Sequence, residues 1–219
     1  MKRHFISFAL LCASLMFGSC GDNESNDVPN VDGVPGTNHR VLIAYFSDPL
    51  PDGVDANTSA SRVIVDGDLY GSVEYMASVI AEATKGDLVR IQTATPYPGN
   101  FNDLASQADN ERQNDIHPAL ATNIANFDDY DVIFVGYPIW WYQMPMAMYS
   151  FFDEYDFSGK TIIPFSSHGG SGWSGTLDDI TRMEPNATIV EGYSISRSNV
   201  ANSENGIHEW LGRIGMSGQ

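Results

Sequence analysis

The sequence predicts an α/β fold in which a parallel sheet carries helices on both faces. Short apolar runs rich in β-branched and aromatic residues predict buried strands. Segments with an apolar period of 3.6 residues lie between them, and this alternation of strand and helix favours parallel pairing through helical crossovers. The predicted strands are 41–46, 88–93, 131–136, 161–165 and 187–190, and the predicted helices are 70–84, 102–114, 144–155, 176–183 and 205–214.

The first predicted helix illustrates how its limits are set. Val73, Met76 and Ile80 recur at helical spacing and define one apolar face. Glu74 lies in the first turn, where a carboxylate is favourable, and Lys85 precedes a glycine that ends the helix. The strand predicted at 131–136 has the clearest pattern, because four of its residues are consecutive and apolar.

The N-terminus has the pattern of an export signal. Basic residues at 2–4 precede an almost unbroken apolar run at 5–17, and small residues at 18–19 precede Cys20. This cysteine resembles that of the lipobox of bacterial lipoproteins, in which it is lipidated and becomes the first residue; the alternative is an ordinary signal peptide that leaves a free thiol. We therefore predict a signal peptide at 1–19, a lipidated cysteine with a polar tether at 20–39, and a protein anchored in a bacterial cell envelope on its periplasmic or surface face.

Composition limits the partners of the domain predicted at 40–219. The chain has 11 Lys and Arg against 28 Asp and Glu, for a net charge of −17, so nucleic acid is an unsuitable partner. After the leader no apolar run approaches the roughly 18 residues that span a bilayer, so membrane contact is expected through the lipid anchor alone. The histidines at 39, 117 and 208 lack the spacing of metal ligands, and we predict no metal site.

Parallel sheets bind ligands beyond the carboxyl ends of their strands, which directs attention to three loops. They are residues 47–49, 137–142 and 166–173. The second loop contains four aromatic residues, Tyr137, Trp140, Trp141 and Tyr142. Such a cluster favours a flat aromatic ligand, because ring stacking adds about 0.5 to 1.5 kcal/mol to area burial. The alternative is that two of the four pack under the edge of the sheet.

These segments carry a resemblance to a known family. The strand and loop at 41–47, the Tyr-Pro-Ile-Trp-Trp element at 137–141 and the glycine-rich loop at 166–172 occur in the order and spacing of the flavodoxin-like family. The resemblance covers residues 40–214 and extends to the segments at 96–98 and 117–120. It implies a flavodoxin-like three-layer sandwich, a five-stranded sheet in the order 2-1-3-4-5, and flavin mononucleotide (FMN) as the cofactor.

The resemblance also implies a position for each part of FMN, with the phosphate at the first loop and the following helix start and the isoalloxazine ring between the other two loops. The residues expected to hold the phosphate are Ser47, Gly71, Ser72 and Val73. The residues expected along the ring are Pro138, Ile139 and Trp140, with Tyr137 or Trp141 against its face. The residues expected at the other edge of the ring are Ser167, His168, Gly169 and Gly170.

The physical chemistry of the phosphate site leaves two alternatives. Free backbone N–H groups at a helix start bind a dianion without Lys or Arg, which supports a site at residues 71–73. However, an insertion at 48–70 separates Ser47 from that helix, whereas the family opens the helix almost at once. The hydroxyl-rich stretch 57–61 inside the insertion is therefore an alternative phosphate site, or else a solvated loop.

The function predicted from these features is electron transfer by an FMN-binding redox protein of the cell envelope. Its partner would be a redox protein or a quinone-like substrate, and His168 would donate a proton or a partial positive charge to the reduced flavin, unless it is an exposed loop histidine. Two alternatives remain: an FMN-dependent NAD(P)H or quinone reductase whose insertion covers the substrate, and a flavin-free binding or scaffold module.

Overall fold

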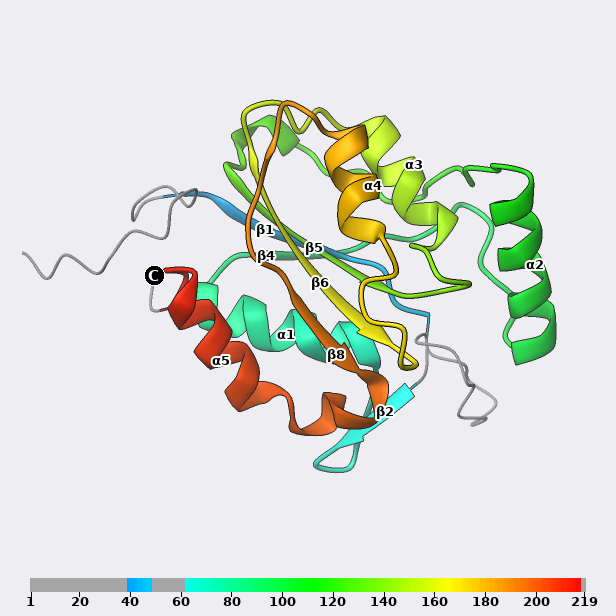
Figure 1. Ribbon diagram of the computed structural model, residues 1–219, viewed down its shortest axis with the longest axis horizontal. Coiled ribbons are helices and arrows are strands. Elements are labelled where there is room, and N and C mark those ends of the chain that lie inside the picture. The colour runs from blue at the N-terminus through cyan, green and yellow to red at the C-terminus, as the bar shows by residue number, and fades with distance from the viewer. Residues whose placement is uncertain (1–38, 49–61, 218–219) are drawn as a thin grey trace, which may run out of the picture.

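A computed structural model describes residues 39–48 and 62–217, and it contains a parallel sheet. The export signal, Cys20 and the hydroxyl-rich stretch 57–61 lie outside the described residues. The strands in spatial order are β4 (Asp87–Arg90), β1 (Val41–Tyr45), β5 (Val132–Pro138), β6 (Thr161–His168) and β7 (Thr188–Ile189), and β8 (Tyr193–Ser196) also pairs with β6 (Figure 1). All these pairs are parallel, which confirms the predicted order 2-1-3-4-5.

The fifth position of the sheet is divided between β7 and β8 because of a proline in β6. Val190 donates its N–H to the carbonyl of Ile162, so the backbone polar groups of Ile162 face the fifth strand. Since these groups alternate along a strand, the nitrogen of Pro164 faces the same side and has no hydrogen to donate. At the break, a Cβ on Gly192 would lie 2.6 Å from the Pro164 carbonyl oxygen, so glycine permits the close approach.

Helices cover both faces of the sheet and form two cores. On one face lie α1 (Ser72–Thr84), α5 (Glu204–Arg213) and the 3₁₀ helix η2 (Arg197–Asn202); on the other lie α3 (Met146–Glu154) and α4 (Thr176–Met183), with the 3₁₀ helix η1 (Phe127–Asp129). Figure 1 shows α2 (Phe101–Gln113) beyond the carboxyl ends of the strands. Alternation along β1 divides the cores, because Leu42 packs on the α3 side and Ile43 on the α1 side.

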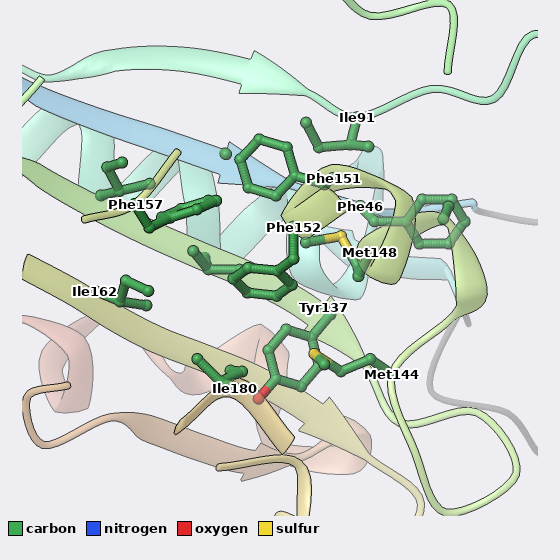
Figure 2. Close-up of a cluster of buried hydrophobic side chains, with 14 of the residues drawn as sticks. Phe46, Ile91, Tyr137, Met144, Met148, Phe151, Phe152, Phe157, Ile162 and Ile180 are labelled. Atoms are coloured by element: carbon green, nitrogen blue, oxygen red, sulfur yellow. The ribbon is translucent and has the colours of Figure 1, made fainter. Parts of the chain in front are cut away.

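Aromatic side chains fill much of the core beneath α3 and α4. Phe151 and Phe157 are fully buried, and their ring centroids lie 5.4 Å apart in an edge-on arrangement (Figure 2). Gly136 in β5 has a related role on the opposite face. A Cβ there would lie 2.1 Å from the ring of Phe165, so glycine is needed for that ring to pack over the strand.

The predicted insertion contains an ordered hairpin that sequence analysis did not predict. β2 (Arg62–Val65) and β3 (Asp68–Gly71) pair antiparallel. The turn residues Asp66 and Gly67 have φ of 51° and 95°, which the Asp-Gly pair tolerates and which suits a tight hairpin. Consequently the helix predicted at 70–84 begins at Ser72, because Tyr70 and Gly71 belong to β3. The Asp-Gly signal in the sequence would have revealed this hairpin.

Within residues 39–48 and 62–217, no helix has the length and apolar character needed to cross a membrane.

Candidate functional site

A cleft of about 530 Å³ lies at the carboxyl ends of β5 and β6. Ligand sites commonly have volumes of roughly 300 to 1,000 Å³ and mainly apolar walls. The loop after β5 contributes Ile139, Trp140, Trp141 and Tyr142, the loop after β6 contributes Gly169, Gly170 and Ser171, and α2 contributes Phe101, Leu104, Ala105 and Ala108. Two of the three predicted loops therefore meet at one cleft, and α2 provides a further wall.

A tight turn presents two aromatic side chains at this cleft. Trp140 and Gln143 exchange two backbone hydrogen bonds of 2.9 and 3.0 Å. The residues between them, Trp141 and Tyr142, have φ of 50° and 64°, a region that costs residues other than glycine of order 1 to 3 kcal/mol each. Their side chains are 49% and 75% exposed, so core packing does not account for this conformation. Strained backbone with exposed aromatic groups is typical of a binding site.

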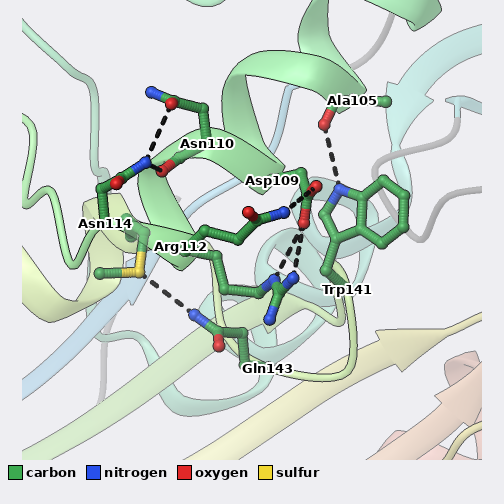
Figure 3. Close-up of polar contacts among 9 residues, drawn as sticks. Ala105, Asp109, Asn110, Arg112, Asn114, Trp141 and Gln143 are labelled. Atoms are coloured by element: carbon green, nitrogen blue, oxygen red, sulfur yellow. Dashed lines mark hydrogen bonds and ion pairs between the residues drawn. The ribbon is translucent and has the colours of Figure 1, made fainter.

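A hydrogen bond joins this turn to helix α2. The indole N–H of Trp141 donates to the carbonyl oxygen of Ala105 at 3.1 Å (Figure 3). One turn further along α2, Arg112 donates twice to Asp109, with distances of 3.1 and 2.7 Å. The exposed ring of Trp141 is therefore held in a defined position between the loop after β5 and α2.

Trp140 belongs to the core, in contrast to its neighbour. It is 4% exposed, and its ring meets Phe46 and Tyr97 edge-on at centroid distances of 5.3 and 5.4 Å. We call Phe46, Tyr97 and Trp140 the aromatic cluster. The indole N–H of Trp140 is buried and has no hydrogen-bond partner in the structure that is described. An unpaired buried donor costs about 1 to 3 kcal/mol, so a ligand that accepts this hydrogen bond would gain affinity.

Tyr137, predicted as one of two residues against a ring, lies in the core instead. It is fully buried beneath α4, its hydroxyl donates to Thr176 Oγ1 at 2.9 Å, and this burial raises its pKa (Figure 2). Its neighbour Pro138 ends β5 and is buried. The alternative in which two of the four aromatic residues pack under the sheet edge thus describes Tyr137 and Trp140, whereas Trp141 is at the cleft.

Contacts after β6 favour the neutral form of His168. The N–H of Gly170 donates to His168 Nδ1 at 3.0 Å, so in the neutral ring the proton lies on Nε2. Desolvation lowers the pKa of this histidine. The structure therefore favours a neutral donor over the expected positive charge, and the amide of Gly170 is already paired. Ser167 is buried, and its carbonyl accepts the N–H of Ile139 at 2.9 Å, which joins the two loops.

At the helix start predicted to bind a phosphate, the N–H of the N-cap residue is paired with a carboxylate. Gly71, the residue before α1, donates its N–H to Glu74 Oε2 at 2.9 Å. Ser72 and Val73 follow as buried residues, each 1% exposed. The Glu74 carboxylate thus satisfies the N–H of the N-cap residue Gly71 from within the same helix. The prediction of a free donor at Gly71 was wrong, because the N3 glutamate pairs with it.

A second, polar cavity of about 140 Å³ lies at the carboxyl ends of β1 and β4, with Phe46 and Tyr97 in its lining. It also includes Ser47, Asp48 and Arg90. Arg90 Nη2 donates to the Ser47 carbonyl and lies 3.7 Å from Asp48 Oδ1. Burial raises the pKa of Asp48 to about 6, although Arg90 acts in the opposite direction.

Comparison with known proteins assigns the family. A sequence model of the flavodoxin family matches residues 63–214, which is more than half of the chain. The chain belongs to the flavodoxin family. No curated protein matches it.

Solved structures share the flavodoxin fold. A proposed flavoprotein from Bacteroides eggerthii is 28% identical, with a TM-score of 0.62, and the match covers 81% of this chain and 99% of that one. A proposed flavoprotein from Bacteroides uniformis is 27% identical, with a TM-score of 0.57 and coverage of 75% and 96%. A flavoprotein from Lactobacillus acidophilus, solved in complex with FMN, is 14% identical, with a TM-score of 0.55 and coverage of 75% and 98%, and shows the fold alone.

Two parts of this flavodoxin's site were missed in the sequence, although signals for both exist. The helix predicted at 102–114 was given no part in the site, yet Phe101, Leu104, Ala105 and Ala108 recur at i, i+3, i+4 and i+7 and form the stripe that lines the cleft. Arg90 is a cation within the strand predicted at 88–93, where an unpaired charge is costly and usually has a partner. In the part of the chain that the structure describes, no group of three or more His, Cys, Asp or Glu could hold a metal ion.

Proposed function

We propose that this flavodoxin-family chain binds FMN in the cleft between the aromatic turn and the glycine loop, and that it transfers electrons. The observation that carries the proposal is the combination of a largely apolar cleft of about 530 Å³ with an exposed, strained Trp141-Tyr142 turn at its edge. When bound, FMN supplies the ability to accept and release electrons. The protein residues supply binding, orientation and electrostatics.

The chain's own residues suit a flat, largely apolar ring with polar edges. Trp141 and Tyr142 provide exposed aromatic faces, and Ile139 provides an apolar contact. The unpaired indole N–H of Trp140 is a donor for a ring oxygen or nitrogen. Gly169 and Gly170 add no side chain that would block close approach, and Gly170 has a φ of 126° that a larger residue would resist.

His168 and the overall charge influence the electron affinity of the bound flavin. A neutral His168 offers a hydrogen-bond donor at Nε2 instead of a positive charge. With a net charge of −17, the protein disfavours added negative charge on the flavin, which lowers its reduction potential. The same charge steers partners with basic surfaces toward the protein. The partner we propose is a redox protein with such a surface, or a quinone-like substrate.

Export and lipidation at Cys20 complete the proposal, and one feature of the domain supports it. Arg40, near the start of the described chain, lies 2.8 Å from Asp129 and 3.6 Å from Asp87 at the amino ends of the strands. The cleft lies at the carboxyl ends. Because the described chain begins at the sheet edge opposite the cleft, an anchor at Cys20 is compatible with access of a partner to the cleft.

The test uses the chain from Asp22 onward, incubated with excess FMN and desalted. We expect retained flavin absorbance with quenched fluorescence, followed by complete reduction with dithionite. A colourless protein with unquenched FMN would contradict the proposal and favour the flavin-free scaffold. Oxidation of NADH in the presence of a quinone would contradict a pure carrier and favour the reductase.

A further inference from the structure

The glycine loop after β6 forms one wall of the cleft and has little packing of its own. Gly169, Gly170 and Ser171 line the cleft and are exposed. Gly170 and Gly172 have φ of 126° and 61°, and a Cβ added to either would meet no atom of the described structure within 4 Å. Glycine-rich backbone with few contacts has many accessible conformations, so a fixed wall requires an anchor outside the glycines themselves.

Trp173 supplies a large side chain directly after these glycines, and it packs on the break in the fifth strand. A Cβ on Gly192 would lie 2.8 Å from both Cη2 and Cζ2 of the indole, a distance that real side chains do not tolerate. The ring of Trp173 also faces that of Tyr137 at a centroid distance of 6.4 Å. Trp173 is not among the described residues that line the cleft, so its influence on a ligand there passes through the loop.

The backbone of Trp173 is fixed to the core as well. Its carbonyl oxygen accepts the N–H of Thr176 at 3.0 Å and the hydroxyl of Thr176 at 2.7 Å. Thr176 is fully buried, and its hydroxyl oxygen accepts the hydroxyl of Tyr137 at 2.9 Å. Both the ring and the carbonyl of Trp173 are therefore held, and the glycine loop ends at a fixed point.

The break against which Trp173 packs is supported separately from the other face of the sheet. Trp210 of α5 is fully buried and donates its indole N–H to the carbonyl oxygen of Glu191 at 3.0 Å. Trp210 belongs to the core on the α1 side, whereas Trp173 packs against the core on the α3 side. A substitution of Trp173 therefore removes the anchor of the loop and leaves this support of the break in place.

We propose that Trp173 is a positioning residue, which packs on Gly192 and thereby holds the glycine loop in the conformation that contacts the ligand of the cleft. The identity of that ligand as FMN rests on the proposed function. The proposal also gives the divided fifth strand a role. The strand is interrupted opposite Pro164, and the interruption presents a glycine surface on which the indole rests.

The first test measures the backbone motion of the loop in the unliganded protein. We expect NMR order parameters of about 0.85 for the amides of residues 169–172 in the wild type and below about 0.6 in Trp173→Leu. The matched control is Phe157→Leu. Phe157 is a fully buried ring of the same core, so this variant should lose stability without a change in the loop.

The second test measures FMN affinity and the midpoint potential of the bound flavin. Trp173→Leu should weaken FMN about tenfold, because binding then includes the cost of ordering about one more backbone residue. His168, at the start of the loop, offers an Nε2–H donor that stabilises the reduced ring more than the oxidised one. The potential should therefore fall, by about 59 mV for a one-electron step if the reduced form loses about tenfold more affinity. Phe157→Leu should change neither quantity.

A double-mutant cycle isolates the contact between Trp173 and Gly192. Gly192→Ala adds a methyl group beneath the indole and should weaken FMN about tenfold when Trp173 is present. In the Trp173→Leu background the same substitution should have no further effect on FMN affinity, because the ring that it displaces is absent. If Trp173→Leu does not fold, Trp173→Phe replaces it, with effects in the same direction and smaller.

The failure of this proposal is distinguishable from that of the proposed function. Unchanged order parameters in Trp173→Leu overturn the proposal, and so does a mobile loop with unchanged FMN affinity and potential. Additive effects of the two substitutions also overturn it. A wild-type protein that binds no FMN overturns the proposed function, and the order parameters then decide by themselves whether Trp173 fixes the loop.

Discussion

The two cavities at the carboxyl edge of the sheet lie against the same aromatic cluster and have opposite chemistry. The larger, of about 530 Å³, has mostly apolar and aromatic walls, while the smaller, of about 140 Å³, contains a serine, an aspartate and an arginine. Phe46 and Tyr97 line the small cavity, and Trp140 lines the large one. The comparison shows that one sheet edge presents an apolar and a charged environment in separate places.

The two cavities also differ in the energetic cost that each imposes on the folded protein. In the large cleft the cost is backbone strain, because Trp141 and Tyr142 have positive φ. In the small cavity the cost is desolvation, because the Ser47 hydroxyl is buried without a described partner and Asp48 has a raised pKa. Substitutions that affect one cavity alone can therefore separate the contribution of the large cleft from that of the small cavity.

The largest effect should come from Trp140, which lines the large cleft and packs on two residues that line the small cavity. Trp140→Ala removes a buried ring from the aromatic cluster, and we expect a loss of about 3 to 5 kcal/mol in the free energy of unfolding, measured by urea denaturation. Tyr142→Ala, at a side chain that is 75% exposed, is the control and should change stability by less than about 0.5 kcal/mol. Equal stabilities would mean that the cluster does not support the fold.

The next effect concerns the small cavity and its dependence on pH. The folded pKa of Asp48 is raised from 3.8 to about 6, so the folded state binds more protons than the unfolded state between these values, and stability falls as pH rises through this window. One pKa unit corresponds to about 1.4 kcal/mol, and we expect a loss of about 2 kcal/mol between pH 4 and pH 7 that Asp48→Asn does not show. Parallel stability curves for the two proteins would contradict this assignment.

A smaller effect is expected for ligand binding in the large cleft. Trp141→Ala removes both the exposed ring and the hydrogen bond to Ala105 and should weaken FMN about tenfold, as judged by fluorescence quenching. Trp141→Phe keeps a ring and loses the hydrogen bond, so its affinity should lie between those of Trp141→Ala and the wild type. If Phe and Ala behave alike, the hydrogen bond to α2 matters more than stacking.

The smallest effect separates the core from the cleft. Tyr137→Phe removes the hydroxyl that donates to Thr176 and should cost about 1 kcal/mol of stability while leaving FMN affinity unchanged. Calorimetry and a flavin titration on the same sample measure both quantities. A loss of FMN affinity without a loss of stability would instead indicate that Tyr137 contacts FMN.

Much of the fold was predictable because its signals are local. The apolar runs at β1, β5 and β6 and the periodicity of α1 gave the elements to within a few residues. The strand order came from the resemblance to a family, since spacing alone does not fix it. The division of the fifth strand was not predicted, because it depends on which side of β6 the nitrogen of Pro164 faces.

The sequence predicted which loops form the candidate site. It did not predict which partners the individual residues contact. Ile139, Trp141 and Gly169 lie together at the cleft, as the resemblance to the family implied. Their cofactor contacts stay a prediction. The N–H of Gly71 is paired with the glutamate three residues later, an outcome that a Gly-x-x-Glu spacing also allowed, and its expected contact with a phosphate stays a prediction.

By itself the sequence determined which segments become strands and helices and which loops carry aromatic rings and glycines, because those properties depend on neighbours a few residues away. The tertiary structure decided which of the described groups are paired and which are buried without a partner. Tyr137 pairs with Thr176, Trp141 with Ala105 and Arg90 with Ser47, across 39, 36 and 43 residues respectively. Such partners meet only once the sheet and its helices have packed, so no local pattern specifies them.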